Sequence, residues 1–290
     1  MIKIKVGLDP EFMVKYKGNY IYPILRSIKD FESDTDYYAA CKIGMDEFGH
    51  CAEIRPAEGM SGKEVVLNTI SAMADLPGQF KYYSDNTHQM DKKTFIRILR
   101  KIGRKDLSDS SNIYDIDILD DCAMDLAVRQ KGQRLLFCGC HMHLSATESF
   151  TQRYKGETIN VSHNYKLPVK ALVWLFDSLI FECLKDDKHF DIGRYRRTGF
   201  YELKSHGGFE YRSLGASTLT PTRIRLVSDL MIEITETVVK NLNEFVFLTS
   251  KPGVSLADFT FSVEVRDMLT ALAKTKDCTS DLRKLWVPFD

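Results

Sequence analysis

The chain has 290 residues, of which 44% are hydrophobic, and its 40 Lys and Arg residues balance 40 Asp and Glu residues. This neutrality argues against a general binder of nucleic acids or of anionic membranes, because such proteins carry a basic excess. Without a bilayer-spanning apolar run or a secretory signal, and with seven cysteines in no regular framework, a cytoplasmic protein is expected. No Pro/Gly/Ser-rich linker divides the chain, so we expect one domain over residues 1–290.

The first half of the chain shows strand and helix signals in alternation. Apolar residues alternate with lysines at 2–6 and predict a strand, whose partner is expected at 20–25, after a turn at 17–19. A capping-box pattern, Ser-Gly-Lys-Glu, opens a predicted helix at 61–74. A short basic helix is expected at 94–102.

The second half is richer in helix signals. Apolar residues at helical spacing predict a helix at 168–179, and Thr-Pro at the start of 220–238 is typical of an N-cap followed by a first-turn proline. A last helix is predicted at 263–273, and Arg223 and Arg225 are assigned to the exposed face of the long helix. The order of elements lacks regular βαβ alternation and favours an α+β fold with a largely antiparallel sheet.

A histidine-rich strand is the most informative motif. The segment 138–145 reads Cys-Gly-Cys-His-Met-His-Leu-Ser and follows an apolar run. On a strand, His141 and His143 project to one face, where they can meet a metal or a phosphate. Zinc bound by these histidines with Cys138 and Cys140 is an alternative, but the cysteines would lie on the opposite face and the spacing is tight for a structural zinc site.

Two short acidic segments are candidates for metal binding. Asp9 and Glu11 lie two apart and share a strand face, and paired carboxylates suit Mg²⁺ or Mn²⁺. Pro10 between them predicts an edge strand or a bulge. Glu53 lies in Cys-Ala-Glu-Ile-Arg-Pro, where an ion pair with Arg55 is the simpler interpretation. A solvated strand face is the alternative for Asp9 and Glu11.

Basic residues close to a late strand are candidates for phosphate binding. Arg194 and Arg197 precede Glu210 and Arg212, which again lie two apart. Convergent arginines stabilise the charge of a phosphoryl group in transfer. A basic surface turn is the alternative, and the chain has no Walker-type phosphate loop.

Taken in order, these motifs resemble a known superfamily of ligases. The strand at 138–145 is similar to the Gly-x-His-x-His-x-Ser strand of glutamine synthetases, and Asp9-Pro-Glu11 resembles their Glu-x-Glu metal strand. Glu53 in Glu-Ile-Arg-Pro and Glu210 in Gly-Phe-Glu-Tyr-Arg match the glutamate–cysteine ligase branch. Together the motifs, from residue 7 to about residue 217, resemble the phage carboxylate–amine ligases of the phiEco32-like type 2 group.

The resemblance implies a glutamine synthetase-like domain, in which helices flank a curved antiparallel sheet. It implies ATP and Mg²⁺, or Mn²⁺, as cofactors and metal ligands at Asp9, Glu11, Glu53, His141 and Glu210. The nucleotide is expected to bind at His143, Ser145 and Lys204. The charge of the transferring group is expected to be neutralised by Arg212, Arg194 and Arg197. The implied reaction joins a small-molecule or peptide carboxylate to an amine through an acyl phosphate, in the host cytoplasm if the protein is encoded by a phage.

One departure from the family pattern leaves a non-catalytic function open. Relatives often carry an arginine shortly after the glycine that corresponds to Gly199, whereas this chain reads Tyr-Glu-Leu-Lys at 201–204. Lys204 does not reproduce a bidentate guanidinium. The alternatives are a phosphotransferase similar to the guanidino kinases and a non-catalytic descendant that binds a nucleotide or a partner.

Overall fold

The computed structural model describes residues 2–16, 19–21, 43–45, 52–54, 58–74, 80–83, 87–91, 97, 129–130, 133–137, 140–184, 198–205, 207–215, 220–249, 253, 255–256 and 259–275. The strands are β1 (Ile2–Tyr16), β2 (Asn19–Ile21), β3 (Ile43–Met45), β4 (Ala52–Ile54), β5 (Phe80–Tyr83), β6 (Thr87–Asp91), β7 (Arg129–Gln130), β8 (Gln133–Phe137), β9 (Cys140–Tyr154), β10 (Glu157–Asn164), β11 (Tyr201–Leu203) and β12 (Phe209–Tyr211). The helices are α1 (Gly62–Ala74), α4 (Val169–Phe176), the π-helical turn η5 (Asp177–Phe181), α5 (Glu182–Leu184), α6 (Pro221–Lys240), α7 (Leu242–Thr249) and α8 (Val263–Ala273).

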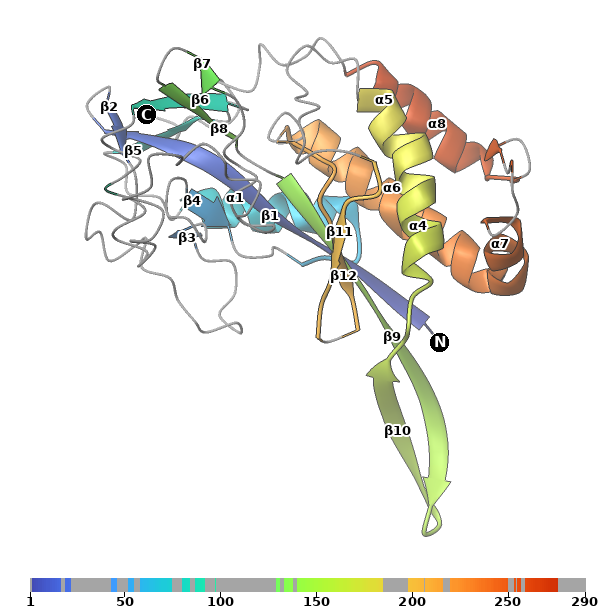
Figure 1. Cartoon of the computed structure of the whole chain (residues 1–290). Helices are drawn as coiled ribbons and strands as arrows, with labels where there is room; N and C mark the ends of the chain where they lie inside the picture. The colour runs from blue at the N-terminus through green and yellow to red at the C-terminus, as the bar shows by residue number, and fades with distance from the viewer. Residues whose placement is uncertain are drawn as a thin grey trace.

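Strand β1 lies inside the main sheet, whose order is β11-β12-β9-β1-β4-β3. It pairs with β9 over Ile2–Pro10, with β4 at Glu11 and Phe12, and with β5 and β2 near its end. Figure 1 shows β1 and β9 crossing the molecule as long neighbouring strands. All strand pairs among the described residues are antiparallel, which confirms the expected α+β class with an antiparallel sheet.

One face of this sheet is apolar. The alternation of side chains along a strand places Val6 and Leu8 of β1 on the same face as Met142 and Leu144 of β9, and all four are fully buried or nearly so. The apolar face continues onto β12, since Phe209 pairs with Leu144. Burying an aliphatic side chain of this size contributes roughly 1.5–3 kcal/mol, so this face anchors the sheet.

Helices cover the apolar face. The ring of Phe176 in α4 lies 6.4 Å from the ring of Phe209 and 5.6 Å from that of Tyr211. Buried α6 residues such as Leu230 and Met231 belong to the same core. Figure 1 shows α4, α6 and α8 together beside the sheet, so the opposite face of the sheet is the one left for polar chemistry.

The predicted helices at 61–74, 220–238 and 263–273 are confirmed. Thr220 is the N-cap of α6, and its Oγ1 accepts a hydrogen bond of 3.0 Å from the Arg223 amide. The helix expected at 168–179 begins as α4 but widens into the π-helical turn η5. Such a turn has one extra residue, which apolar spacing alone does not reveal.

The assignment of Arg223 to the exposed face of the long helix was wrong, whereas Arg225 is exposed as predicted. Arg223 is fully buried; its Nε donates a 2.9 Å hydrogen bond to Thr275 Oγ1 and its Nη2 donates to the Thr275 carbonyl. The side chain therefore joins the start of α6 to the residues that follow α8. Buried guanidinium groups need such acceptors, because an unpaired buried charge is costly.

Part of the predicted framework lies outside the described residues. The expected partner strand at 20–25 is described only as β2, which pairs with β1 as predicted. Of the basic helix expected at 94–102, only residue 97 is described. Among the described residues, no helix is both long and apolar enough to cross a membrane.

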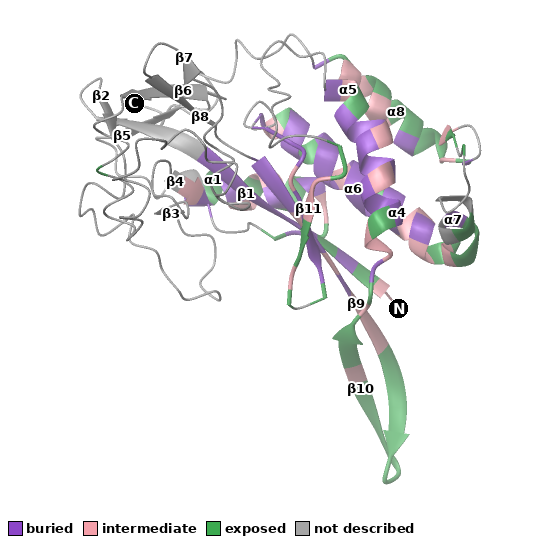
Figure 2. Cartoon of the chain, viewed as in Figure 1, coloured by how far each residue is buried: buried purple, intermediate pink, exposed green. Residues whose placement is uncertain are grey.

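A two-stranded arm, residues 147–164, extends from the sheet. It is formed by the second half of β9 and by β10, joined at Lys155 and Gly156, which both have positive φ (50° and 86°). Two residues of this conformation form the tight turn that suits the twist of a hairpin. Figure 1 shows the arm projecting past the rest of the described chain, and Figure 2 shows that most of it is exposed.

Candidate functional site

The second face of the main sheet carries ionisable side chains in adjacent strands. Residues directly opposite each other in an antiparallel pair share a face. Asp9 of β1 is opposite His141 of β9, and His143 is opposite Glu210 of β12. Gly7 is opposite His143 on the other side and has no side chain to fill the space. The register therefore builds a polar patch across three strands.

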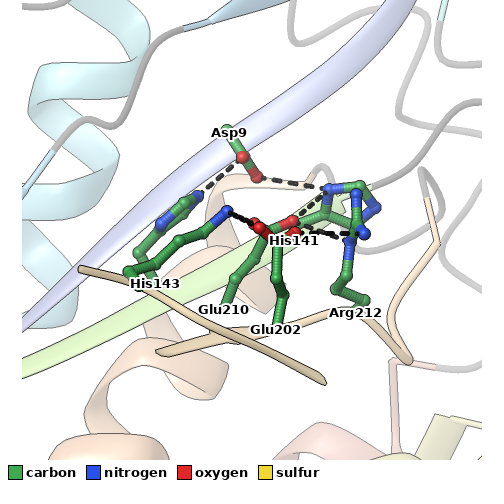
Figure 3. Close-up of polar contacts among 7 residues, drawn as sticks. Asp9, His141, His143, Glu202, Glu210 and Arg212 are labelled. Atoms are coloured by element: carbon green, nitrogen blue, oxygen red, sulfur yellow. Dashed lines mark hydrogen bonds and ion pairs between the residues drawn. The ribbon is translucent and has the colours of Figure 1, made fainter. Parts of the chain in front are cut away.

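Asp9 contacts both histidines. Its Oδ2 lies 2.6 Å from His143 Nε2, and its Oδ1 lies 3.8 Å from His141 Nδ1 (Figure 3). His141 Nδ1 is also 2.9 Å from Glu210 Oε1. Asp9, His141 and Glu210 are each at most 5% exposed, so these contacts form in a region with little water, where they are stronger than at a surface. The predicted projection of both histidines to one face is confirmed.

Two carboxylates and two cations form the other side of the patch. Glu202 of β11 is directly opposite Glu210. Lys204 Nζ lies 3.0 Å from Glu202 and 2.5 Å from Glu210, while Arg212 lies 3.2 Å from Glu202 and 2.9 Å from Glu210. The Arg212 guanidinium also lies over the Phe200 ring, 5.7 Å from its centroid. Lys204 and Arg212 therefore neutralise a carboxylate pair that would otherwise repel.

The charges of the patch shift its pKa values strongly. Burial alone would lower the pKa of His141, but the hydrogen bond to Glu210 and the charges of Asp9, Glu11 and Glu210 raise it to about 9. Burial would also lower the pKa of His143, but the charge of Asp9 and the hydrogen bond to it outweigh burial and raise this pKa. Although burial would raise the pKa of Glu210, His141 and Arg212 hold it well below the usual range. Without a metal, His141 is therefore cationic at neutral pH.

Glu11 and Glu53 extend the patch by one strand. They are directly opposite each other in the β1·β4 pair, and Glu11 is 3% exposed. Glu11 lies on the Asp9 face of β1 and contributes to the raised pKa of His141. The expected convergence of Asp9, Glu11 and Glu53 on one side of the sheet is therefore seen in the register.

The edge strand or bulge expected at Pro10 is not seen. Strand β1 has neighbours on both sides, and its register with β9 runs to Pro10 without an extra residue. The Val6 amide donates a 3.0 Å hydrogen bond to Gly59, on the side of β1 away from β9. Because backbone direction alternates, the Pro10 nitrogen also faces away from β9, and no hydrogen bond to β9 is lost. Pairing with β9 ends at Pro10 and pairing with β4 begins at the next residue.

The donor set fits a divalent cation. Asp9, His143 and Glu210 each present one ligand atom within 4.8 Å of the others. Ligands on opposite sides of a Mg²⁺ ion are about 4.2 Å apart, given Mg–O distances of about 2.1 Å. Asp9 Oδ1 is buried and accepts no hydrogen bond from the described residues. A buried carboxylate oxygen without a hydrogen-bond donor is a natural ligand for a cation.

The residues expected around this centre fall into three groups. Asp9, His141, His143, Lys204, Glu210 and Arg212 are brought together. Glu11 and Glu53 are paired beside them, and Ser145 follows His143 on the same face of β9. Arg194 and Arg197 lie outside the described residues. His143 was expected at a nucleotide and His141 at a metal; the structure groups His143 with the convergent ligand atoms, while His141 holds Glu210.

Two contributors were not predicted from the sequence. Glu202 was noted only as a departure from the family pattern, yet it binds both cations of the patch. Asp177, on the helix side of the sheet, accepts hydrogen bonds from Tyr211 Oη (2.7 Å), Ser213 Oγ (3.3 Å) and the Gly199 amide (2.5 Å). It thereby holds the start of β11 and the end of β12 together, and these two strands carry Glu202 and Glu210, with Arg212 directly after β12. A carboxylate inside an apolar helical segment was the available signal.

The zinc alternative loses one of its ligands. Cys140 is fully buried in the core, on the face of β9 opposite His141 and His143. Cys138 lies outside the described residues. The predicted separation of these side chains is confirmed for Cys140.

Comparisons with protein-family models, curated proteins and solved structures found no significant match.

Proposed function

We propose that this protein is an ATP- and Mg²⁺-dependent carboxylate–amine ligase with a glutamine synthetase-like catalytic sheet. The observation that carries the proposal is the convergence of buried Asp9 and Glu210 with partly buried His143, together with an Asp9 oxygen that accepts no hydrogen bond from the described residues. The ordered resemblance of the surrounding motifs supports it. Small-molecule or peptide carboxylates and amines are the proposed substrates, and Mn²⁺ is an alternative ion, because imidazole and carboxylate ligands suit it.

The chain's own residues can divide the work of such a reaction. When bound, a divalent ion would neutralise charge on phosphate oxygens. Arg212 offers a planar fork of donors suited to a phosphoryl group, and Lys204 offers a compact charge next to it. Both cations lie against Glu210, one of the proposed metal ligands, so they and the ion would act on the same anion. His141, bonded to Glu210, keeps that carboxylate oriented.

The proposed chemistry has two steps. The substrate carboxylate attacks the γ-phosphorus of ATP, forms an acyl phosphate and releases ADP. The amine then attacks the acyl carbon and inorganic phosphate leaves, so an amide or isopeptide bond forms. Arg212 and Lys204 stabilise the negative charge of the phosphoryl group in the first step and of the leaving phosphate in the second.

The first test is a thermal-shift measurement with Mg²⁺ and a non-hydrolysable ATP analogue. A ligand at a hundredfold excess over its Kd stabilises the native state by about 2.7 kcal/mol, so a clear rise in Tm is expected. Glu11→Gln removes a buried charge at almost constant volume and should abolish that rise. Glu233→Gln, the same change on an exposed position of α6, is the matched control and should keep it.

The result separates the proposal from its alternatives. A Mg²⁺-dependent shift followed by amine-dependent release of phosphate supports a ligase. A shift followed by a phosphorylated product without free phosphate indicates a phosphotransferase. A shift without turnover of any acid–amine pair supports a non-catalytic nucleotide binder. No shift in the wild-type protein would contradict nucleotide binding at this patch.

A further inference from the structure

The β9–β10 arm has an unusual outer edge. Among the described residues, β10 pairs only with β9, so its other edge has unpaired backbone groups. Natural edge strands are protected by lysines, prolines or bulges, but β10 reads Glu-Thr-Ile-Asn-Val-Ser-His-Asn and has none of the three. An isolated two-stranded hairpin is marginally stable in water, whereas three or more strands support one another.

The arm also has two different faces. Phe150, Tyr154 and Ile159 lie on one face and are 45%, 57% and 39% exposed, and Val161 lies opposite Phe150. The other face carries hydroxyl and amide side chains, with Ser149 Oγ 2.8 Å from Ser162 Oγ. A strand added at the β10 edge would therefore place apolar side chains beside apolar ones only if its own apolar face lay on the same side as the apolar face of the arm.

The direction of the β10 backbone can be read from the ladder. The amide of Tyr165, just after β10, donates a 2.8 Å hydrogen bond to Ala146 of β9. Because direction alternates along a strand, odd-numbered residues of β10 face β9. The amides and carbonyls of Thr158, Asn160 and Ser162 therefore face outward, where another strand can pair with them.

The sequence of β10 is chemically symmetric about Asn160. Reading outward from it, Ile159 matches Val161, Thr158 matches Ser162, and the Glu157 carboxylate matches the His163 imidazole. We propose that two copies of this chain pair through β10, antiparallel and with the two-fold axis at Asn160. In this register Ile159 faces Val161 of the second copy and Glu157 faces His163, while the outward-facing residues meet one another.

Neighbouring registers are poorer. A shift that places Ile159 opposite itself would set Glu157 against Val161, a charge against an aliphatic group. The opposite shift would set Ile159 against His163. Only the register centred on Asn160 matches acid with imidazole, hydroxyl with hydroxyl and aliphatic with aliphatic. His163 already lies 3.4 Å from Glu148 of its own chain, so Glu157 of the second copy would become its second carboxylate.

Proline substitutions on the two edges of the arm test which edge forms the dimer contact. Asn160→Pro removes an outward amide and leaves the β9–β10 hydrogen bonds in place. Thr151 lies opposite Asn160, and its amide faces outward on the other edge of the arm, beyond the end of the β1 pairing at Glu148. Thr151→Pro is therefore the matched control. Sedimentation equilibrium of the full chain should give a dimer for the wild type and Thr151→Pro and a monomer for Asn160→Pro.

A cysteine series tests the register itself. In a hydrogen-bonded antiparallel pair the Cα atoms are about 5.5 Å apart, within the range of a disulfide. Asn160→Cys should therefore form a covalent dimer under mild oxidation. The two copies of Thr158 would be offset by about 13 Å along the strands, too far for a disulfide, so Thr158→Cys should not cross-link. Wild-type protein under the same oxidant measures the background from its native cysteines.

Each outcome decides the matter. A wild-type dimer that Asn160→Pro dissociates, together with cross-linking at position 160 alone, supports pairing in this register. A wild-type monomer up to high concentration overturns the proposal, as does a dimer that tolerates Asn160→Pro or cross-links equally at position 158. Circular dichroism of the proline variants establishes that both remain folded. Loss of ligase activity would not affect these readouts, so this proposal and the proposed function fail separately.

Discussion

At the scale of single residues, the protonated His141 side chain makes the stability of the folded chain depend on pH. The pKa of His141 is about 9 in the folded chain and 6.5 in the unfolded chain. The stabilisation of the folded state by protonated His141 is therefore complete below pH 6.5 and is lost as pH rises through 9. The shift corresponds to stabilisation on the order of 3 kcal/mol.

We predict that the Tm of the metal-free protein falls between pH 6.5 and pH 9, and that His141→Asn reduces this fall. Differential scanning calorimetry at several pH values provides the measurement. Equal pH dependence in the wild type and in His141→Asn would contradict the assignment.

From the sequence one could predict on which face of its strand each side chain lies, but not which residues it contacts. Strand periodicity places His141 and His143 on one face, and Asp9 with Glu11 on another strand's face. Only the register brings those strands together, because the paired residues Asp9 and His141 are 132 residues apart in the sequence. Local pattern therefore could not show that His143, rather than His141, lies with Asp9 and Glu210 at convergent ligand atoms.

At the scale of elements, Arg223 joins the beginning of α6 to the end of α8. Replacing it with alanine leaves Thr275 without its donor and opens space in the core. We predict that Arg223→Ala lowers the free energy of unfolding by about 2–4 kcal/mol. Arg225→Ala, two residues away and exposed, should change it by less than about 0.5 kcal/mol.

Urea denaturation of both variants supplies these values. Equal stability of the two variants would contradict the prediction, because Arg223→Ala removes both the hydrogen bonds to Thr275 and the packing of a buried side chain. A changed urea dependence in Arg223→Ala would indicate that the end of α8 has separated from the core before the main transition.

Helix boundaries were predicted well where local chemistry sets them. Thr220-Pro221 marks the start of α6, and the capping residues at 61–64 mark the start of α1. The buried state of Arg223 was missed because its partner Thr275 is 52 residues away. The π-helical turn η5 was missed because Asp177 is stabilised by Tyr211, Ser213 and Gly199, all distant in sequence.

At the scale of the whole molecule, β1 connects most of the sheet. It pairs with β9, β4, β5 and β2 in turn, so opening β1 disrupts each of those pairs. We predict that the amides of β1 that face β9 exchange with solvent only through global unfolding. Hydrogen exchange followed by mass spectrometry gives the test, and exchange in β1 faster than in α6 would contradict it.

The position of β1 also has a consequence during synthesis of the chain. Gly7 is made first, but its partner His143 follows 136 residues later. At a translation rate of about 5–20 residues per second, the N-terminal strand waits about 7–27 s for that partner. During this interval the Ile2–Pro10 part of β1 lacks its β9 partner strand, although β2, β4 and β5 have already been made. The nascent chain is therefore expected to depend on chaperones that bind extended apolar segments as they leave the ribosome.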